Sequence, residues 1–250
     1  MLIGEPNRQR THESSESRVD RQGLSERRVR MMLRGVTPFR DLPSDEFNDL
    51  ARSALASTFR PGEQIHGAGE PARSMHALVE GRIALGHRID GRRRIQAFVQ
   101  PQHAFAIAPY FTDLKYQSAA WAIETCTIVT VSYSRINAAL ENSPAFAFGM
   151  MRLLAYQAHE AAESLADVNL LDVPGRTAKR LLEFAGAEND FDLEITQQQL
   201  AELIGSTRER VNKLLAQLTC MGILTHHRKS YKILNRSHLI KLASGTVRLT

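Results

Sequence analysis

The sequence predicts an α+β protein in which a β domain, one long helix, and a helical domain with a β hairpin follow one another. Three observations predict it. Short apolar runs separated by glycine fill residues 58–132, a continuous helical pattern covers 144–171, and two capped helices lie close together after residue 195. A chain of 250 residues is long enough for two domains of ordinary size.

The composition narrows the class of protein. No apolar run approaches the roughly 20 residues that cross a bilayer. Residues 1–34 are polar and lack the apolar stretch of a signal peptide, so we expect a cytoplasmic protein with no membrane partner. Lys and Arg number 12 against 15 Asp and Glu over residues 35–173, but 12 against 7 over residues 174–250. A basic C-terminal third favours a polyanionic partner.

The N-terminal region combines a polar tail with a short helix. Residues 1–25 are rich in Arg, Ser, Glu and Gln without apolar periodicity, which predicts a disordered basic tail. We expect the β domain, with flanking helices, to span residues 26–142. A helical unit begins near Pro38, with Ser44 as its N-cap and with Phe47, Leu50 and Ala54 on one face.

The β domain is predicted from alternating apolar runs at short spacing. These runs lie at residues 75–79, 82–85, 95–99, 119–123 and 127–131. Asp90 and Gly91 form the dipeptide typical of a type I′ hairpin turn. Arg92–Arg94 follow as a solvated hairpin tip, with contact to DNA flanks or polymerase as the alternative. Several short strands at this spacing indicate an antiparallel barrel, roll or sandwich.

The long helical stretch carries an apolar seam, and we assign residues 143–173 to it. Apolar residues recur every seven positions in two series, namely Leu154, Ala161 and Val168 with Met151, Ala158 and Leu165. This is the a/d pattern of a coiled coil over about three heptads. The helix either lies in a buried bundle or pairs with a second copy of the chain. Its length and its small alanines favour the dimer.

Residues 174–250 are predicted to form a separate domain after a break at Asp172–Gly175. Within it, Thr196 with Gln199 and Ser206 with Glu209 form two capping boxes ten residues apart. Gly205 lies between them, where a tight turn between helices favours positive φ. A hairpin-like wing follows over 223–234. This is the pattern of a winged helix-turn-helix.

The exposed positions of this motif predict contacts with double-stranded DNA. Arg208, Glu209 and Lys213 lie near the start of the second helix, where arginine and lysine can donate to guanine and glutamate can accept from cytosine. The residues expected to contact the DNA backbone are Thr196, Gln198, Ser206, Thr207, Arg228 and Lys229.

The sequence resembles the cyclic-AMP receptor protein/fumarate–nitrate regulator (CRP/FNR) family of bacterial transcription factors over residues 36–235. The motifs that carry the resemblance are Val173–Ala178, Ile195–Ala201 and Gly205–Val211, with Pro61–Glu63, Gly69–Ala72 and Val79–Gly81 in the β domain. The resemblance implies a β-roll of the cyclic-nucleotide-binding type and a homodimer. It also implies a palindromic site with TGTGA-like half-sites, and RNA polymerase as a partner.

The same resemblance makes the effector pocket look degenerate. The pocket positions are Ala106, Ile107, Gln117 and Ser118. Ile107 stands where the cyclic-nucleotide binders have a glutamate for the ribose, and Gln117 stands where they have an arginine for the phosphate. A phosphate buried without a positive partner costs several kcal/mol. We therefore expect an effector other than cyclic AMP.

Three kinds of sensor are the alternatives to a regulator without a cofactor, namely an iron–sulfur cluster, a haem group and a redox-active thiol. Two cysteines, Cys126 and Cys220, are too few for the family's four-cysteine iron–sulfur site. A haem sensor would use one of the β-domain histidines, which we expect to be surface or satisfied residues, namely His66, His76, His87 and His103. A thiol redox sensor would use Cys220, which we expect to be buried and inert.

A metal-dependent cupin-like enzyme is the hypothesis from a different class of protein. It would need two histidines separated by one residue, and the chain has no such pair. We therefore predict no metal site, no catalytic residues and no enzyme activity.

Overall fold

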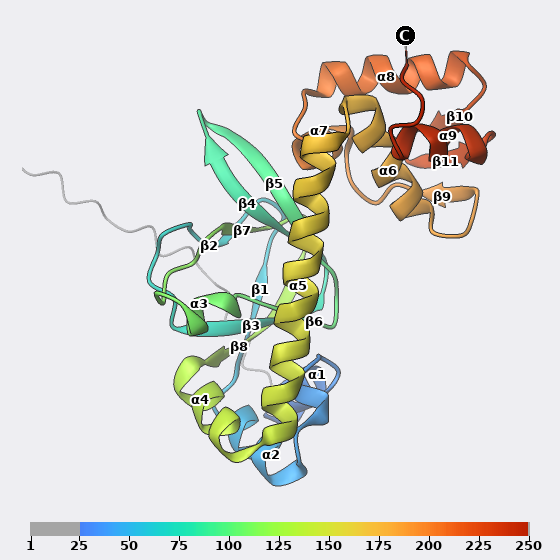
Figure 1. Cartoon of the computed structure of the whole chain (residues 1–250). Helices are drawn as coiled ribbons and strands as arrows, with labels where there is room; N and C mark the ends of the chain where they lie inside the picture. The colour runs from blue at the N-terminus through green and yellow to red at the C-terminus, as the bar shows by residue number, and fades with distance from the viewer. Residues whose placement is uncertain (1–25, 250) are drawn as a thin grey trace, which may run out of the picture.

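The computed structural model describes residues 26–249, and the tail predicted over residues 1–25 lies outside them. A β-roll forms the middle of the molecule, with short helices at one end and a C-terminal domain at the other (Figure 1). One long helix runs along the roll and joins the two. The α+β architecture predicted from the sequence is confirmed.

The roll consists of two four-stranded antiparallel sheets, ordered β1-β8-β3-β6 and β2-β7-β4-β5. The strands are β1 (Leu55–Phe59), β2 (Gln64–His66), β3 (Ser74–Glu80), β4 (Ile83–Ile89), β5 (Arg92–Val99), β6 (His103–Phe105), β7 (Ala119–Ala122) and β8 (Cys126–Ser132). All five predicted runs are strands. Three strands were not predicted. The polar Ser57 and Thr58 hide the apolar pattern of β1, and β2 and β6 have three residues each and are too short to show alternation.

The turn between β4 and β5 has the predicted geometry. Asp90 has φ of 49° and Gly91 has φ of 73°, so both central residues lie in the left-handed region that a type I′ turn requires. The two strands pair from Ile83 opposite Val99 to Ile89 opposite Arg92. The result is a long hairpin that projects from the roll to the height of the C-terminal domain, with its tip leaning away from that domain (Figure 1).

Helices close one end of the roll. They are α1 (Glu26–Arg34), the 3-10 helix η1 (Phe39–Asp41), α2 (Ser44–Arg52), the short α3 (Ala108–Phe111) and α4 (Tyr133–Asn142). Leu33, Phe39 and Phe47 are buried in the core between these helices and the first sheet. The N-cap predicted at Ser44 is wrong by one residue, because Pro43 occupies the N-cap position without a side-chain hydrogen bond and Ser44 is the first helical residue of α2.

The helix α5 (Pro144–Leu170) has 27 residues and confirms the predicted helical stretch. The Ser143 hydroxyl accepts a hydrogen bond from the Phe146 amide and so caps its first turn. Within α5 only Phe146 and Met150 are buried, and the half-buried Leu153 and Leu154 also pack against the core of the roll. Beyond Leu154, most of the apolar side chains of α5 are exposed in the single chain.

The C-terminal domain combines four helices with a small sheet, ordered β10-β11-β9. Its elements are α6 (Val173–Ala185), β9 (Asp190–Asp192), α7 (Gln197–Leu203), α8 (Arg208–Cys220), β10 (Leu224–His227), β11 (Ser230–Ile233) and α9 (Arg236–Ala243). The break predicted at Asp172–Gly175 is shorter than expected. The Asp172 side chain caps α6 by accepting from the Gly175 amide at 2.9 Å, so Pro174 and Gly175 lie inside its first turn.

The roll and the C-terminal domain contact each other directly. Arg82, which is buried and directly precedes β4, forms an ion pair with Glu194 and also donates to the Glu194 carbonyl oxygen at 3.2 Å. Phe98 of β5 packs against the hydrophobic core of the C-terminal domain. Within residues 26–249, no helix has both the length and the apolar character needed to cross a bilayer.

Candidate nucleic-acid interface

Two short helices and the turn between them form the centre of the candidate interface. The Thr196 hydroxyl accepts from the Gln199 amide at 3.2 Å, and the Gln199 side chain accepts from the Thr196 amide at 2.7 Å. This capping box at the start of α7 confirms the sequence prediction. Gly205 has φ of +69°, the left-handed conformation expected in the turn that follows.

The second capping box is wrong by one position. Thr207 caps α8, because its hydroxyl accepts from the Arg210 amide at 3.3 Å. Ser206 instead lies in the turn, where its amide donates to the Ala201 carbonyl oxygen at 2.8 Å. Serine and threonine are both good N-caps, so the choice between neighbours depends on the geometry of the turn.

The inner faces of the two helices form one hydrophobic core. The buried residues that hold α7 and α8 together are Leu200, Ala201, Ile204, Val211, Leu214, Leu215 and Leu218. Ala201 is fully buried where the helices approach each other. Since this core occupies one side of α8 completely, the opposite side faces away from the protein.

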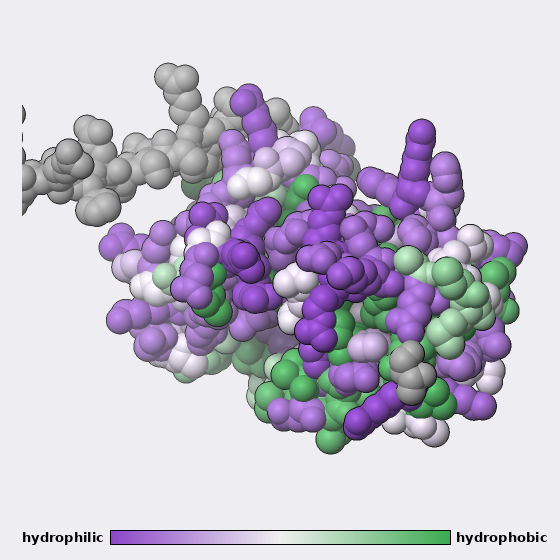
Figure 2. Space-filling view, turned by 90° about the horizontal axis from the view of Figure 1, so that it is seen from above, coloured by the Kyte–Doolittle hydropathy of each residue, from purple (hydrophilic) through white to green (hydrophobic). Residues whose placement is uncertain are grey.

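The predicted base-reading residues all lie on that outward side. Arg208, Glu209 and Lys213 are exposed, and Lys213 forms an ion pair of 3.0 Å with Glu209 one turn earlier. Both side chains of this pair are about three-quarters exposed, at 76% and 77%. An exposed pair of this kind is weak, so both groups can exchange partners at little cost. Hydrophilic side chains cover most of this end of the molecule (Figure 2).

The predicted backbone contacts gather at the amino ends of α7 and α8, with the wing beside them. Thr196 and Thr207 are the N-caps, so their hydroxyls are engaged while the first amides of both helices face outward. Gln198 donates to Glu202 at 2.9 Å. Arg228, with φ of 56°, lies with Lys229 at the turn between β10 and β11, and both are exposed.

The predicted dimer seam is open to solvent in the single chain. Three of its members are more than half exposed, namely Met151 at 58%, Leu165 at 63% and Val168 at 61%. Leu154 is half-buried, and Ala158 and Ala161 are exposed. Phe148 and Tyr156 of α5, which the seam prediction did not include, are also exposed, at 60% and 58%. A row of exposed apolar side chains of this size marks an interaction surface.

The predicted effector pocket borders a cluster of four packed rings. Ile107 is buried, with 1% exposure, whereas Gln117 is exposed and donates to the Thr112 hydroxyl at 3.3 Å. Ala106, with φ of 58°, directly precedes Ile107. Ser118 is half-buried at the end of the chain segment that leads into β7.

The sequence did not reveal the ring cluster itself, which consists of His66, His76, Phe105 and Tyr116. His66 stacks on Tyr116 with ring centroids 3.8 Å apart, and His76 lies 5.1 Å from Phe105. The His76 ring nitrogens bond to the Thr130 hydroxyl at 3.0 Å and the Tyr116 hydroxyl at 3.3 Å. Burial lowers the pKa of His66 to about 4 and that of His76 to about 3, so both rings are neutral at pH 7.

The two buried histidines differ in their hydrogen bonds. Both nitrogens of His76 are engaged, and the ring of His66 lies against Tyr116 with the backbone of Gly67 and Ser118 beside it. Axial ligation needs an imidazole nitrogen that opens onto a slot for the porphyrin. Both ring nitrogens of His66 are buried without a hydrogen-bond partner among the described residues.

The two thiols differ in their exposure. Cys220 is exposed, so the expectation that it is buried is wrong: it lies at the carboxyl end of α8, beyond the last buried position, Leu218. Reactive thiolates favour the amino ends of helices instead. Cys126 is buried and donates to the Arg82 carbonyl oxygen at 3.1 Å. Among the described residues, no group of three or more His, Cys, Asp and Glu is placed to hold a metal ion.

Two family profiles match the two ends of this architecture. Residues 56–143 match the cyclic nucleotide-binding domain, and residues 175–242 match the Crp-like helix-turn-helix domain. The first match covers the roll and α4, and the second covers α6 to α9. The segment between the two matched regions contains α5, the helix with the exposed seam.

Curated relatives and solved structures agree with these profiles. The chain is 28% identical over 206 residues to the CRP-like cAMP-activated global transcriptional regulator of Mycobacterium tuberculosis, covering 77% of this chain and 92% of that protein. It is 27% identical over 175 residues to the cAMP-activated global transcriptional regulator CRP of Pasteurella multocida, covering 66% and 83%. The structure of FixK2 from Bradyrhizobium japonicum has the same fold, with a TM-score of 0.68, 24% identity and coverage of 79% and 99%.

Proposed function

The chain belongs to the CRP/FNR family of transcription regulators, and from this premise we propose that it binds double-stranded DNA as a homodimer. The observation that carries the proposal is α8. Its inner face is held in a hydrophobic core, while Arg208, Glu209 and Lys213 are exposed on the opposite side near its first turns. A helix presented in this way enters the major groove with its amino end toward the base edges.

The three exposed side chains suit a TGTGA-like half-site. Arg208 donates two hydrogen bonds to the O6 and N7 atoms of one guanine, and Glu209 accepts from a cytosine amino group. Lys213 donates to a second guanine, but as a single flexible ammonium it fixes that base less firmly than an arginine would. On binding, Glu209 and Lys213 exchange their mutual ion pair for contacts with the bases.

The seam on α5 supplies the two-fold axis. Two copies of the helix that pair through Met151, Leu165 and Val168 bury side chains that are more than half exposed in the single chain. Each dimer then presents two copies of α8 to a two-fold-symmetric operator. Bound there, the dimer has RNA polymerase as its further partner, as in the family.

We also propose that the effector is not cyclic AMP. The two relatives described above are named as cAMP-activated, but the pocket of this chain has Ile107 and Gln117 at the positions of the ribose acceptor and the phosphate cation. Beside them, Tyr116 and His66 stack at 3.8 Å. A cyclic phosphate placed there would lose its hydration without gaining a cation.

Selection of bound duplexes from a random pool, with and without cyclic AMP, tests the proposal as a whole. We expect an enriched two-fold-symmetric site with TGTGA-like halves and the same site and yield in both conditions. Enrichment of no sequence would contradict DNA reading by α8. A yield that rises with cyclic AMP would contradict the effector assignment alone.

Arg208→Ala is expected to cost roughly 1–3 kcal/mol of binding free energy on the selected site, because one bidentate base contact is lost. Fluorescence anisotropy with the selected duplex and a scrambled one measures this change. Arg135→Ala, which removes an exposed arginine from α4 at the far end of the molecule, is the control and should bind as the wild type does. An equal loss on both duplexes would show that Arg208 contacts phosphates and not bases.

The wing variant Arg228→Ala/Lys229→Ala is expected to weaken binding to every duplex by the same factor. These cations lie at the exposed turn between β10 and β11, where they suit phosphates. Removing two phosphate contacts makes the slope of log affinity against log salt shallower by about two. A titration of potassium chloride on both duplexes measures it. A change in sequence preference without a change in slope would refute the assignment.

A further inference from the structure

The hairpin of β4 and β5 ends in a cluster of cations that the proposed function does not use. Residues 88–94 contain four arginines and one aspartate, Asp90. Arg88 and Arg92 are exposed, and Arg93 and Arg94 are half-buried. Among residues 26–249, none of the four arginines forms an ion pair with a carboxylate.

The register of the hairpin sets these cations against one another. Arg88 lies directly opposite Arg93, and Arg94 lies directly opposite His87. Like charges at directly opposed positions destabilise a strand pair. Arg93 is held by the face of Trp121, with its guanidinium carbon 6.0 Å from the ring centroid. No carboxylate within the described residues forms an ion pair with Arg88 or Arg93, so no salt bridge offsets the repulsion between them.

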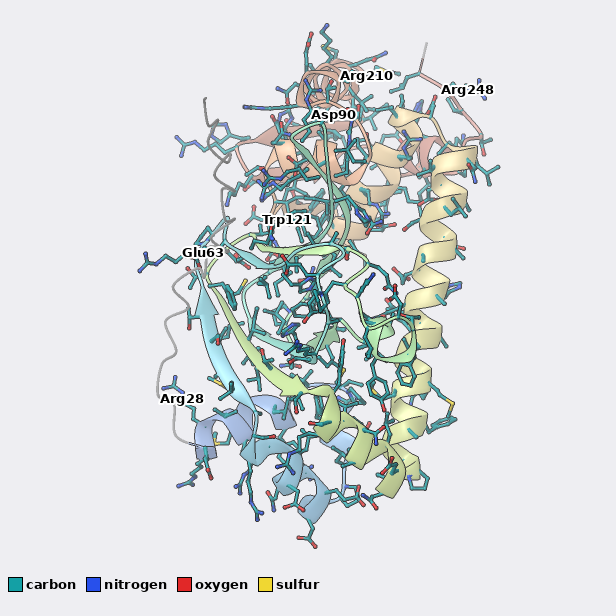
Figure 3. The ribbon with its side chains drawn as sticks, turned by 90° about the vertical axis from the view of Figure 1, so that its left-hand side faces the viewer. Arg28, Glu63, Asp90, Trp121, Arg210 and Arg248 are labelled. Carbon is teal, nitrogen blue, oxygen red and sulfur yellow. The ribbon has the colours of Figure 1, made fainter. Side chains whose placement is uncertain are left out.

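The hairpin reaches the same end of the molecule as α8. Figure 3 shows Asp90, at its tip, at the level of the C-terminal domain, and Figure 1 shows from a perpendicular direction that the hairpin rises to this end of the molecule, with its tip standing apart from α8. At its base, β5 contacts α7, the helix that precedes α8, and Phe98 packs into the core of that domain. The cations are therefore fixed relative to the candidate interface.

We propose that the hairpin tip is a second phosphate-binding surface, which contacts the backbone of the same duplex that α8 reads. The inference rests on the proposed DNA binding and adds a contact from the roll to those of the C-terminal domain. Unpaired arginines on a projecting strand pair match the polyanionic backbone in charge and read no bases. Whenever α8 is seated, Arg88 and Arg92 replace counterions on phosphates next to the half-site.

The test compares two double variants that remove the same charge. Arg88→Ala/Arg92→Ala removes two cations from the hairpin. Arg52→Ala/Arg135→Ala removes two exposed ones from α2 and α4, at the opposite end of the roll. Binding to a duplex with two TGTGA half-sites, and to a scrambled duplex, is measured by fluorescence anisotropy over a series of potassium chloride concentrations.

The hairpin variant is expected to bind both duplexes several-fold more weakly. Its slope of log affinity against log salt should be shallower by about two, one for each cation removed. The ratio between the two duplexes should stay as in the wild type, because no base contact is lost. The control variant should match the wild type in slope and affinity. The hairpin variant should also unfold at an unchanged or higher temperature, since the repulsion between Arg88 and Arg93 is gone.

Three other results are informative in different ways. An unchanged slope in the hairpin variant, with wild-type DNA binding intact, would overturn the phosphate contact and leave the proposed function standing. Unchanged DNA binding together with lost transcription in vitro would overturn it in favour of an acidic protein surface as the partner of the hairpin. A wild-type chain that binds neither duplex would overturn the proposed function, and the inference with it.

Discussion

Replacing Leu165 by aspartate is expected to convert the dimer into a monomer and to lower operator affinity by at least about 100-fold. Leu165 is 63% exposed in the single chain, so its replacement leaves the core of each domain intact. In the paired helices the aspartate would be buried opposite its own copy, where two unpaired carboxylates cannot be accommodated. A monomer binds each half-site independently and loses the gain of roughly 10²–10⁴ that linking two sites supplies.

Light scattering after gel filtration measures the mass, and anisotropy on the two-half-site duplex measures the affinity. Leu170→Asp is the matched control, because Leu170 is even more exposed, at 77%, but lies outside the seam. It should remain dimeric. If Leu165→Asp stayed dimeric at the same concentration, the subunits would not be joined through this face of α5.

The roll is expected to lose stability as the pH falls from about 6.5 toward 4. Burial lowers the pKa of His66 to about 4 and that of His76 to about 3, from 6.5 in the unfolded chain. Between these values the unfolded state binds more protons than the folded one, so acidification favours unfolding. Above pH 6.5 both states are neutral at these sites and the loss vanishes. His66 alone accounts for on the order of 3 kcal/mol across this window.

Urea unfolding at a series of pH values measures this loss, followed by the fluorescence of Trp121. That residue is the single tryptophan and lies in β7, so the signal reports on the roll. His66→Phe keeps a ring against Tyr116 but removes the titrating group, and its stability should fall less steeply below pH 6.5. His103→Phe removes an exposed histidine instead and should leave the wild-type slope unchanged. The same slope in all three proteins would refute the role of the ring cluster.

Features that depend on residues close together in the sequence could be predicted. The helix-turn-helix shows both the success and the limit of such predictions. Thr196 and Gln199 are three residues apart, so their capping box could be predicted from the sequence and is present. Ser206 and Thr207 have nearly the same capping preference, and the turn at Gly205 decides between them. The periodic strands and α5 were predicted for the same local reason. The site assignments on α8 and α5 stay predictions that the experiments above test.

Features that depend on distant segments could not be predicted. Arg82 meets Glu194 across 112 positions, and His76 meets Tyr116 across 40. No local pattern encodes such contacts, since packing of whole elements brings them together. The burial of His66 follows from the stacking of β2 against the segment before β7, where four rings collect. The exposure of Cys220 follows from where the core of the C-terminal domain ends on α8.

The length of α5 makes it a lever arm. Its 27 residues extend about 40 Å at the rise of an α-helix. A tilt of only about 5° about one end of the helix displaces the other end by about 3.5 Å, which is close to the rise of one base pair. The preferred spacing between half-sites is then set by side chains such as Leu154 and Ala161, which never approach DNA. Operator spacing and base preference would therefore evolve through separate substitutions, the first in the seam and the second on α8.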